Sequence, residues 1–500
     1  MVQDKKLTLE EATIADIHAA MQSGKLTCRK LVEMYLARIA AYDKKGAALN
    51  SILMINPQAL ETADKMDKTY ATSGFVGPLH CIPVVLKDNY DTADMPTTGG
   101  SKILERSIPP ADGFLVRKLK KAGALILAKA NMHELALVGV TLSSLGGQTL
   151  DPYDLTRTPG GSSGGTGTAI AANFAVLGMG TDTVNSTRSP ASACNLVGVR
   201  PTKGLLSREG IIPVSFTQDA AGPIVRTVRD AALMIDAMTG YDPADPVTAW
   251  SIGRTKTYTA SLKKNGLKGA RIGVIKTFFG SKPEHEEVNR VMAKAIEVMK
   301  KQRAVIVEVN DPALEAEKLN EEGDVRRFEF KAVFNNYLAG LGPKAPVKNL
   351  AEFLAVGTFH KPSLEKFLTD AQNIENPLNQ PDYKNRLLRN TKLQQIVMSL
   401  MADNRLDALV YPLQKRLVAP VGELNQADRN GILAALTGFP AIDVPAGFST
   451  PTANAPLGVP VGLDFFGRPW SEDTLFSLAY SFEQATKHRR PPMSVPFFFQ

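Results

Sequence analysis

Residues 157–204 read RTPGGSSGGTGTAIAANFAVLGMGTDTVNSTRSPASACNLVGVRPTKG, and this stretch decides how the chain folds. Two loops rich in glycine and serine enclose AIAANFAVLGMG, an apolar run long enough for a helix and a strand. We therefore expect a loop, a buried helix, a strand and a second loop, in that order. Small residues let two backbones approach closely, which a site built from main-chain donors requires.

Short apolar runs typical of buried strands lie on both sides of this stretch. They are IPVVLKD (82–88), GALILAKAN (123–131), GARIGVIK (269–276), RLDALVYP (405–412) and GFPAIDVPAGF (438–448). Helical spacing separates them, and this alternation predicts an α/β protein with one mixed sheet. Between about 283 and 403 charge is high and helical spacing dominates, which indicates a peripheral helical layer.

The overall composition excludes several classes of protein. The 500 residues are 44% hydrophobic and 22% charged, which is typical of a soluble globular chain and not of a disordered, collagenous or coiled-coil one. The net charge is +8, but the basic residues form no block long enough for a nucleic-acid interface. No apolar run reaches the roughly 18 residues that a membrane span needs. We expect a cytoplasmic protein with no nucleic-acid or membrane partner, although a secreted chain with its signal removed would look the same.

Cysteine and histidine usage argues against metal chemistry and disulfides. Cys28, Cys81 and Cys194 are far apart and odd in number, so the sequence predicts neither a disulfide framework nor a metal knuckle. The six histidines are scattered, and HExxH, EF-hand and GxxxxGK[ST] motifs are absent. We therefore expect no metal and no cofactor. GGSSGG matches a nucleophile elbow by letter, but the preceding DLTRTP is a poor strand.

Lys87 is the candidate base that remains. It closes the apolar run IPVVL, and burial at a strand end pulls the pKa of a lysine down. A neutral amine is a competent general base. The alternative is a structural ion pair between Lys87 and Asp88 or Asp91.

The glycine- and serine-rich stretch strongly resembles the signature of the amidase signature family, whose members are serine amidohydrolases with a Ser-cisSer-Lys triad. GPLHCIPVVLKDNYDTADMPTTGGS (77–101) resembles the family's lysine strand, and GFPAIDVPAGF resembles one of its C-terminal strands. The segment SREGIIPVSFTQDAAGPIVRTVRDAA (207–232) is closer to the free-standing peptide-amidase-like branch than to others.

The resemblance implies a fold and its division along the chain. We expect a single amidase domain over residues 1–500, with one mixed central sheet covered by helices on both faces and a helical cap insertion. Its parts are N-terminal helices (1–75), a catalytic core with the signature (76–243), a variable helical cap region (244–405), and C-terminal core strands and a helix (406–500).

The resemblance also implies site roles. Lys87 becomes the base, Ser162 the bridging serine after a cis Gly161–Ser162 peptide, and Ser186 the nucleophile. The residues whose backbone N–H groups would form the oxyanion hole are Thr183, Val184, Asn185 and Ser186. The side chains that would support this loop are those of Asp182, Arg188 and Ser163.

Two departures from the family pattern bear on the site. Val184-Asn185 stands where most members have Gly-Gly, so either this loop needs no left-handed residue at 184 or its geometry differs. Cys81 stands where glycine is usual, and we interpret it as a packing residue. In the cap, Phe330, Phe334 and Tyr337 either line an apolar acyl site or, as their helical spacing favours, belong to a core.

These expectations point to an amidohydrolase that cleaves a linear amide to an acid and ammonia or an amine through an acyl-enzyme. A carbamate or ester hydrolase would use the same triad. A third possibility is the glutaminase subunit of a glutamine-dependent amidotransferase complex. The expected partner is a small-molecule amide or carbamate substrate, and the expected assembly is a monomer or homodimer.

Overall fold

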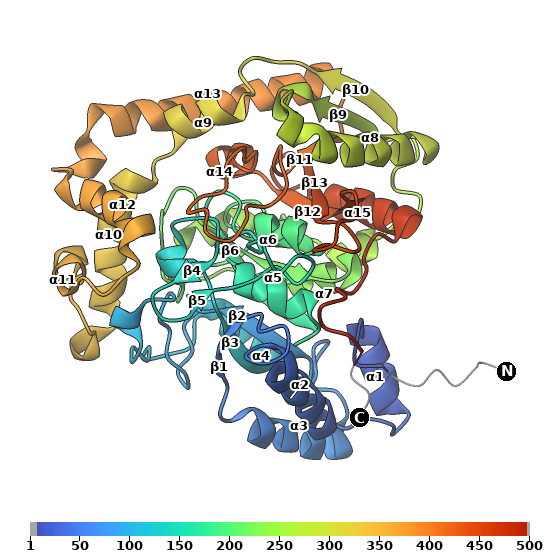
Figure 1. Ribbon diagram of the computed structural model, residues 1–500, viewed down its shortest axis with the longest axis vertical. Helices are drawn as coiled ribbons and strands as arrows, with labels where there is room; N and C mark the ends of the chain where they lie inside the picture. The colour runs from blue at the N-terminus through green and yellow to red at the C-terminus, as the bar shows by residue number, and fades with distance from the viewer. Residues whose placement is uncertain (1–7, 498–500) are drawn as a thin grey trace.

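The computed structural model describes residues 8–497, and its centre is one mixed β-sheet. Within these residues the sheet has 11 strands in the order β1-β3-β2-β6-β8-β7-β12-β13-β11-β9-β10, and Figure 1 shows it running from β1 at the bottom to β10 at the top. Its strands are β1 (Ile52–Ile55), β2 (Pro83–Lys87), β3 (Leu125–Ala130), β6 (Leu177–Asp182), β7 (Val197–Arg200), β8 (Ala220–Val225), β9 (Arg271–Ile275), β10 (Val305–Val309), β11 (Ala408–Pro412), β12 (Ala441–Phe448) and β13 (Pro460–Phe466). A separate ribbon pairs β4 (Leu142–Ser143) with β5 (Gly147–Gln148).

Parallel and antiparallel pairs are segregated along the sheet. Strands β3, β2 and β6 run parallel, and so do β11, β9 and β10 at the other end. Between them, β6, β8, β7, β12, β13 and β11 pair antiparallel. The parallel pairing of β2 with β6 matters for function because both strands then end at the same edge of the sheet.

Helices enclose the sheet on both sides (Figure 1). They are α1 (Ile14–Gln22), α2 (Cys28–Tyr42), α3 (Ala59–Ser73), α4 (Phe114–Lys121), α5 (Gly164–Ala171), α6 (Arg188–Ala193), α7 (Val228–Met238), α8 (Glu286–Lys301), α9 (Ala316–Gly323), α10 (Arg326–Gly340), α11 (Leu350–Val356), α12 (Lys361–Asn373), α13 (Pro381–Asp403), α14 (Ile432–Thr437) and α15 (Glu472–Thr486).

The two faces of the sheet bury different apolar clusters, as strand alternation requires. On β11, Ala408 and Val410 belong to the main cluster, which includes residues of α7, α8 and α15. Leu409 and Tyr411 of the same strand belong to a second cluster with residues of α13 and α14. The expected α/β fold with a mixed central sheet is therefore confirmed.

Two strands of the central sheet come from the segment 244–405, the expected helical cap region. β9 and β10 lie inside the range 244–405 but pair with the central sheet, whereas α10, α11 and α12 stand beside it at the left of Figure 1. β10 was not predicted from the sequence, although four of its five residues are β-branched, because the high charge of the surrounding segment indicated a helical layer. β1, a four-residue edge strand, was also missed.

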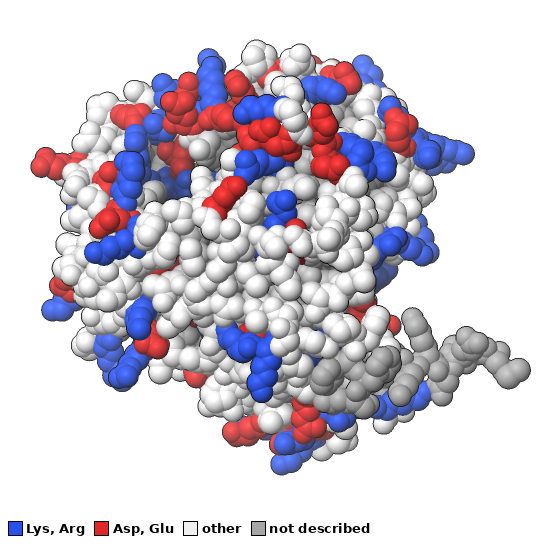
Figure 2. All heavy atoms as spheres, in the orientation of Figure 1, with Lys and Arg blue, Asp and Glu red and all other residues white. Residues whose placement is uncertain are grey.

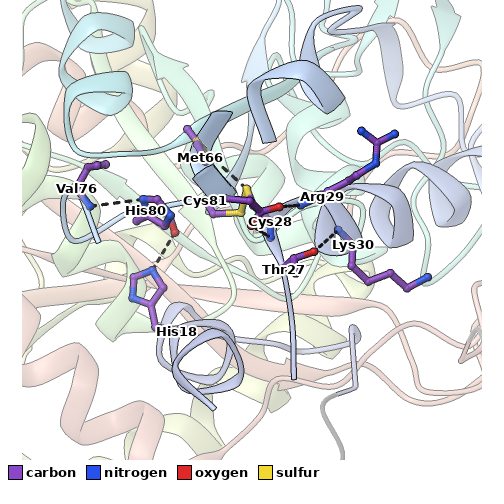
Figure 3. Close-up of a disulfide and its surroundings, with 10 residues drawn as sticks. His18, Thr27, Cys28, Arg29, Lys30, Met66, Val76, His80 and Cys81 are labelled. Atoms are coloured by element: carbon purple, nitrogen blue, oxygen red, sulfur yellow. Dashed lines mark hydrogen bonds between the residues drawn. A yellow bond between two sulfur atoms is a disulfide. The ribbon is translucent and has the colours of Figure 1, made fainter. Parts of the chain in front are cut away.

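The expectation of no disulfide was wrong. Cys28 and Cys81 are joined across 53 residues of sequence, which ties the start of α2 to the segment just before β2 (Figure 3). Cys28 Sγ also lies 3.8 Å from Met66 Sδ of α3. Cys81 has a φ of 61°, a left-handed conformation that glycine adopts more easily. Sequence spacing could not reveal the bond, because only the folded topology brings these residues together. Cys194 is a buried free thiol.

The surface carries charges of both signs. In Figure 2, lysines, arginines and acids gather together at the top of the molecule, over α8, α9 and α13, while the middle of this face is mostly uncharged. None of the helices in residues 8–497 is long and apolar enough to cross a membrane.

Candidate active site

Lys87 ends β2 inside the protein, and its amine contacts two hydroxyl groups. Nζ donates hydrogen bonds to Ser162 Oγ and to Thr181 Oγ1, each at 2.7 Å. Thr181 lies on the neighbouring strand β6, and its hydroxyl also accepts a hydrogen bond from Asn89 Nδ2 at 3.1 Å. The hydroxyl of Thr181 therefore holds the lysine amine against Ser162.

The alternative ion pair of Lys87 is not formed. Asp88 lies 3.9 Å from the amine of Lys129, and Asp91 accepts a hydrogen bond from the hydroxyl of Tyr337 at 2.8 Å. Among the described residues, no carboxylate reaches salt-bridge distance of Lys87. Burial lowers the pKa of Lys87 to about 7, against the weaker opposing effect of Asp182 and Asp219. The amine is thus largely neutral above neutral pH.

Ser162 follows a cis peptide bond with Gly161. Its carbonyl oxygen accepts a hydrogen bond from the backbone N–H of His133 at 2.9 Å. Gly161 has no room for a side chain, because a Cβ there would lie 2.8 Å from the carbonyl carbon of Gly139. Thr141 braces the same loop by donating to Gly160 O at 2.7 Å and accepting from Gly164 N at 3.0 Å.

Ser186 lies in the loop between β6 and α6, beside the bridging-serine candidate. The backbone N–H of Ser163 donates to Ser186 O at 3.3 Å, so the two loops touch. The Ser163 hydroxyl contacts the backbone of Thr181, with both its N–H and its carbonyl at 3.3 Å. Ser186 keeps 7% of its surface exposed, and within the described residues its Oγ has no hydrogen bond to Ser162. The structure thus joins Lys87 to Ser162 directly and places Ser186 next to them without that last contact.

A buried ion network lies behind the Ser186 loop. Arg188 Nε donates to Asp182 Oδ2 at 3.1 Å, and its Nη2 donates to the carbonyl of Val184 at 2.8 Å. Arg200 Nη1 donates to Asp182 Oδ1 at 2.9 Å. Burial alone would raise the pKa of Asp182, but the two guanidinium groups outweigh it and lower that pKa to about 2. The ionised carboxylate also accepts from the N–H of Thr187 at 3.2 Å, so charge-assisted bonds hold this loop on both sides.

The replacement of the usual Gly-Gly by Val184-Asn185 requires no left-handed backbone. Neither residue has a positive φ. The Val184 side chain belongs to the apolar cluster shared by α13 and α14. Asn185 is fully buried, yet neither its Oδ1 nor its Nδ2 has a hydrogen-bond partner among residues 8–497.

The expected cap region contacts the loop that carries the candidate oxyanion residues. Gln218 Oε1 accepts from the N–H of Val325 at 2.8 Å, and its Nε2 donates to the carbonyl of Thr183 at 3.4 Å. Glu329 of α10 accepts from the N–H of Thr217 at 3.0 Å and from the hydroxyl of Ser215. One short segment, 215–218, therefore joins the cap to the Thr183 backbone.

The aromatic residues named in the cap do not share one role. Phe330 and Phe334 stack with ring centroids 5.2 Å apart in a buried apolar cluster, so they form core. Tyr337 instead contacts Asp91. Sequence reasoning did not find Thr181, Thr141 or Gln218. Thr181 lies on a predicted strand, but only the pairing of β2 with β6 in the structure places it beside Lys87.

No group of three or more His, Cys, Asp or Glu side chains in the described part of the chain is arranged to hold a metal ion. The groups that meet at this site are a buried amine, hydroxyl groups and backbone N–H groups.

Comparison with known proteins gives consistent matches along the whole length. The Amidase family model matches residues 30–476. A probable amidase of Arabidopsis thaliana is 33% identical over 98% of this chain and 92% of its own. A glutamyl-tRNA(Gln) amidotransferase subunit from Geobacter sp. (strain M21) is 34% identical over 95% of this chain and 98% of its own. The crystal structure of native peptide amidase from Stenotrophomonas maltophilia superposes with a TM-score of 0.87 at 36% identity, covering 97% of this chain and 98% of that one.

Proposed function

Because this chain belongs to the amidase signature family and is an amidase-type hydrolase, we propose that it cleaves linear amide C–N bonds to a carboxylic acid and ammonia or an amine through an acyl-enzyme on Ser186. The observation that carries this proposal is the 2.7 Å contact between the Lys87 amine and the Ser162 hydroxyl, in a site buried enough to make that amine neutral.

The proposed reaction begins with two proton transfers. Neutral Lys87 accepts a proton from Ser162, Ser162 accepts one from Ser186, and Ser186 Oγ attacks the carbonyl carbon of the substrate. The Ser186–Ser162 contact forms when substrate is bound, since catalytic hydrogen bonds are often long in unliganded enzymes. The protons then return along the same path to the departing amine, and water repeats the attack on the acyl-enzyme.

Backbone donors of residues 183–186 stabilise the developing oxyanion in this scheme. Each such donor contributes about 3 kcal/mol to the transition state. Arg188 and Asp182 hold that backbone from behind, and neither needs to touch the substrate. The same tetrahedral chemistry extends to carbamates and esters, so these substrates form the neighbouring alternative.

A second candidate function comes from the amidotransferase relatives. The Geobacter protein, which is 34% identical over nearly the full length, supports a glutaminase role within a larger complex. The 36% identity to the peptide amidase, together with its TM-score of 0.87, favours the amidase role over the glutaminase role.

Three measurements on the purified chain test the proposal. A fluorophosphonate probe is expected to label Ser186 and not Ser162, Ser163 or Ser189. A panel of aryl amides, peptide amides, carbamates and glutamine ranks the substrate classes. Gel filtration of the active species separates a monomer or homodimer from a protein that needs partners. Labelling at another serine, or turnover only with added partner proteins, would contradict the proposed roles.

A further inference from the structure

Arg429 is a cation near the candidate active site without an acidic partner. It is half-buried, and within residues 8–497 its guanidinium takes part in no salt bridge and no hydrogen bond. Its backbone is firmly placed, because Arg429 pairs with Gln414 and the next N–H, of Asn430, donates to Leu413 O at 2.8 Å. The backbone at Arg429 is thus held by hydrogen bonds, although its guanidinium has no partner among the described residues.

The guanidinium lies against the loop that carries the candidate bridging serine. Nη1 of Arg429 is 2.9 Å from where a Cβ on Gly139 would be. The carbonyl carbon of Gly139 in turn lies 2.8 Å from where a Cβ on Gly161 would be, and Gly161 is bonded to Ser162. The guanidinium is therefore a neighbour of Gly139, and Gly139 is a neighbour of the cis peptide.

The same segment also touches the candidate oxyanion loop. A Cβ on Gly431, two residues after Arg429, would lie 2.3 Å from Asn185 Cβ. Arg188 Nη2 donates to Gly431 O at 3.0 Å, which fixes this approach. The Asn185 amide beside it is buried with both polar atoms unpartnered among the described residues. Such orphaned groups next to a reactive serine are typical of a site that a ligand completes.

Among the described residues no carboxylate forms an ion pair with Arg429, and Asp324 acts on it only from a greater distance. Arg326 is its neighbour on α10, and that guanidinium already pairs with Asp324 at 2.5 Å. Burial lowers the pKa of His133 to about 3, with further contributions from His360, Lys87 and Arg429, so His133 is neutral. Burial also lowers the pKa of Arg429 to about 10, which leaves it protonated at neutral pH. A partly desolvated cation whose nearby carboxylate, Asp324, already pairs with another arginine is stabilised by an anion from outside the chain.

We propose that Arg429 is a specificity residue that binds a carboxylate carried by the substrate. Guanidinium matches a carboxylate in a planar, two-bond arrangement, and Arg429 has its donors free to form one. The inference rests on the proposed amidase function and names its substrate class: amides that bear a free carboxylate at a second position.

Matched substrate pairs test this inference. Monoamides of linear dicarboxylic acids with two to five methylenes are each compared with the neutral amide that has a methyl group in place of the carboxylate. We expect a higher kcat/KM for the acidic member of at least one pair. In R429Q the ratio within that pair falls about 10- to 100-fold, the range for hydrogen bonds to a charged group. R429K gives an intermediate ratio because it keeps the charge and loses the planar fork.

Two controls separate this inference from the underlying function. R327Q removes an exposed arginine of α10 that pairs with Asp382 at 2.9 Å, and it should leave the ratio unchanged. Calorimetry with S186A measures the binding of each substrate pair without turnover. The acidic member should bind more tightly than the neutral one to S186A, and this difference should be lost in the double variant S186A/R429Q. Equal binding in S186A, or an unchanged ratio in R429Q, overturns the carboxylate site while the amidase proposal stands. If no amide is hydrolysed and Ser186 is not labelled, the amidase proposal fails, and the calorimetry still decides the carboxylate site.

Discussion

Replacing Lys87 with methionine is expected to lower activity strongly and at the same time to change how stability depends on pH. The folded protein holds this amine with a pKa of about 7, against 10.5 for an ordinary lysine. At a pH between these two pKa values, the Lys87 amine is protonated in the unfolded chain and neutral in the folded chain. Stability of the wild type therefore rises with pH across this window, by about 1.4 kcal/mol per unit while the difference is a full proton.

The size of the effect follows from the two pKa values. Going from pH 8 to pH 10, the wild type gains about 2.5 kcal/mol of unfolding free energy relative to Lys87→Met. The substitution also removes the hydrogen bonds to Ser162 and Thr181, worth about 1 kcal/mol each, but their loss is the same at both pH values. Comparing two pH values therefore isolates the amine.

The assay is a pair of denaturant titrations at pH 8 and pH 10 for both proteins. Thr166→Val serves as the control, since it removes a buried hydroxyl bonded to Met179 O at 3.1 Å and no titrating group. The difference in unfolding free energy between Thr166→Val and the wild type should be the same at pH 8 and pH 10. In parallel, kcat/KM of the wild type should rise with pH around a midpoint near 7, and Lys87→Met should lose on the order of 10²- to 10⁴-fold. A pH-independent stability difference for Lys87→Met would refute a neutral Lys87.

Further predictions concern the proposed nucleophile, the disulfide and the ion network. Ser186→Ala should lose both fluorophosphonate labelling and amide turnover while unfolding at the same denaturant concentration as the wild type; retained labelling would point to another serine. Cys28→Ala with Cys81→Ala should lower the unfolding free energy by about 4 kcal/mol, as expected for a cross-link spanning 53 residues. Cys28→Ala with Cys81→Gly should recover about 1 kcal/mol of that loss, because glycine accepts the positive φ at 81; equal stability of the two variants would contradict this account. Asp182→Asn should cost about 3–5 kcal/mol, since it leaves two buried arginines without their shared carboxylate. The Asp182 pKa is lowered from 3.8 to about 2, so its contribution is present above pH 3.8 and lost as the pH falls through about 2; an acid titration of the variant should lack that step.

Much of the architecture was predictable from local pattern alone. The apolar runs around Val85, Ile126 and Val444 are short, rich in β-branched residues and bounded by turn residues, and each is a buried strand. The edge strand at Val305–Val309 was not, although it is rich in β-branched residues, because it lies in a segment whose charge and helical spacing predicted only helices. The disulfide between Cys28 and Cys81 depends on the placement of α2 against the segment before β2, which no local pattern encodes.

For the candidate site, sequence reasoning found residues that are unusual among their sequence neighbours. It missed residues whose contacts arise only when distant segments come together in the fold. Lys87 stands out because a lysine at the end of an apolar strand must be explained. Thr181, which supports its amine, looks like any threonine in a strand until β2 and β6 are paired. Arg429 has no distinctive neighbours in sequence, and its lack of a partner among the described residues is visible only once the chain around it is folded.

The attachment of the cap through Gln218 and Glu329 sets a rule for building chimeras of these enzymes. Suppose that only the cap helices are exchanged between two related enzymes. The residue that replaces Glu329 would then face a segment 215–218 of the host, which fits the host's own cap and not the new one. Because Gln218 also contacts the carbonyl of Thr183, the mismatch would reach the reactive loop. Exchanging residues 215–218 together with the helices keeps the hydrogen bonds between the cap and this segment.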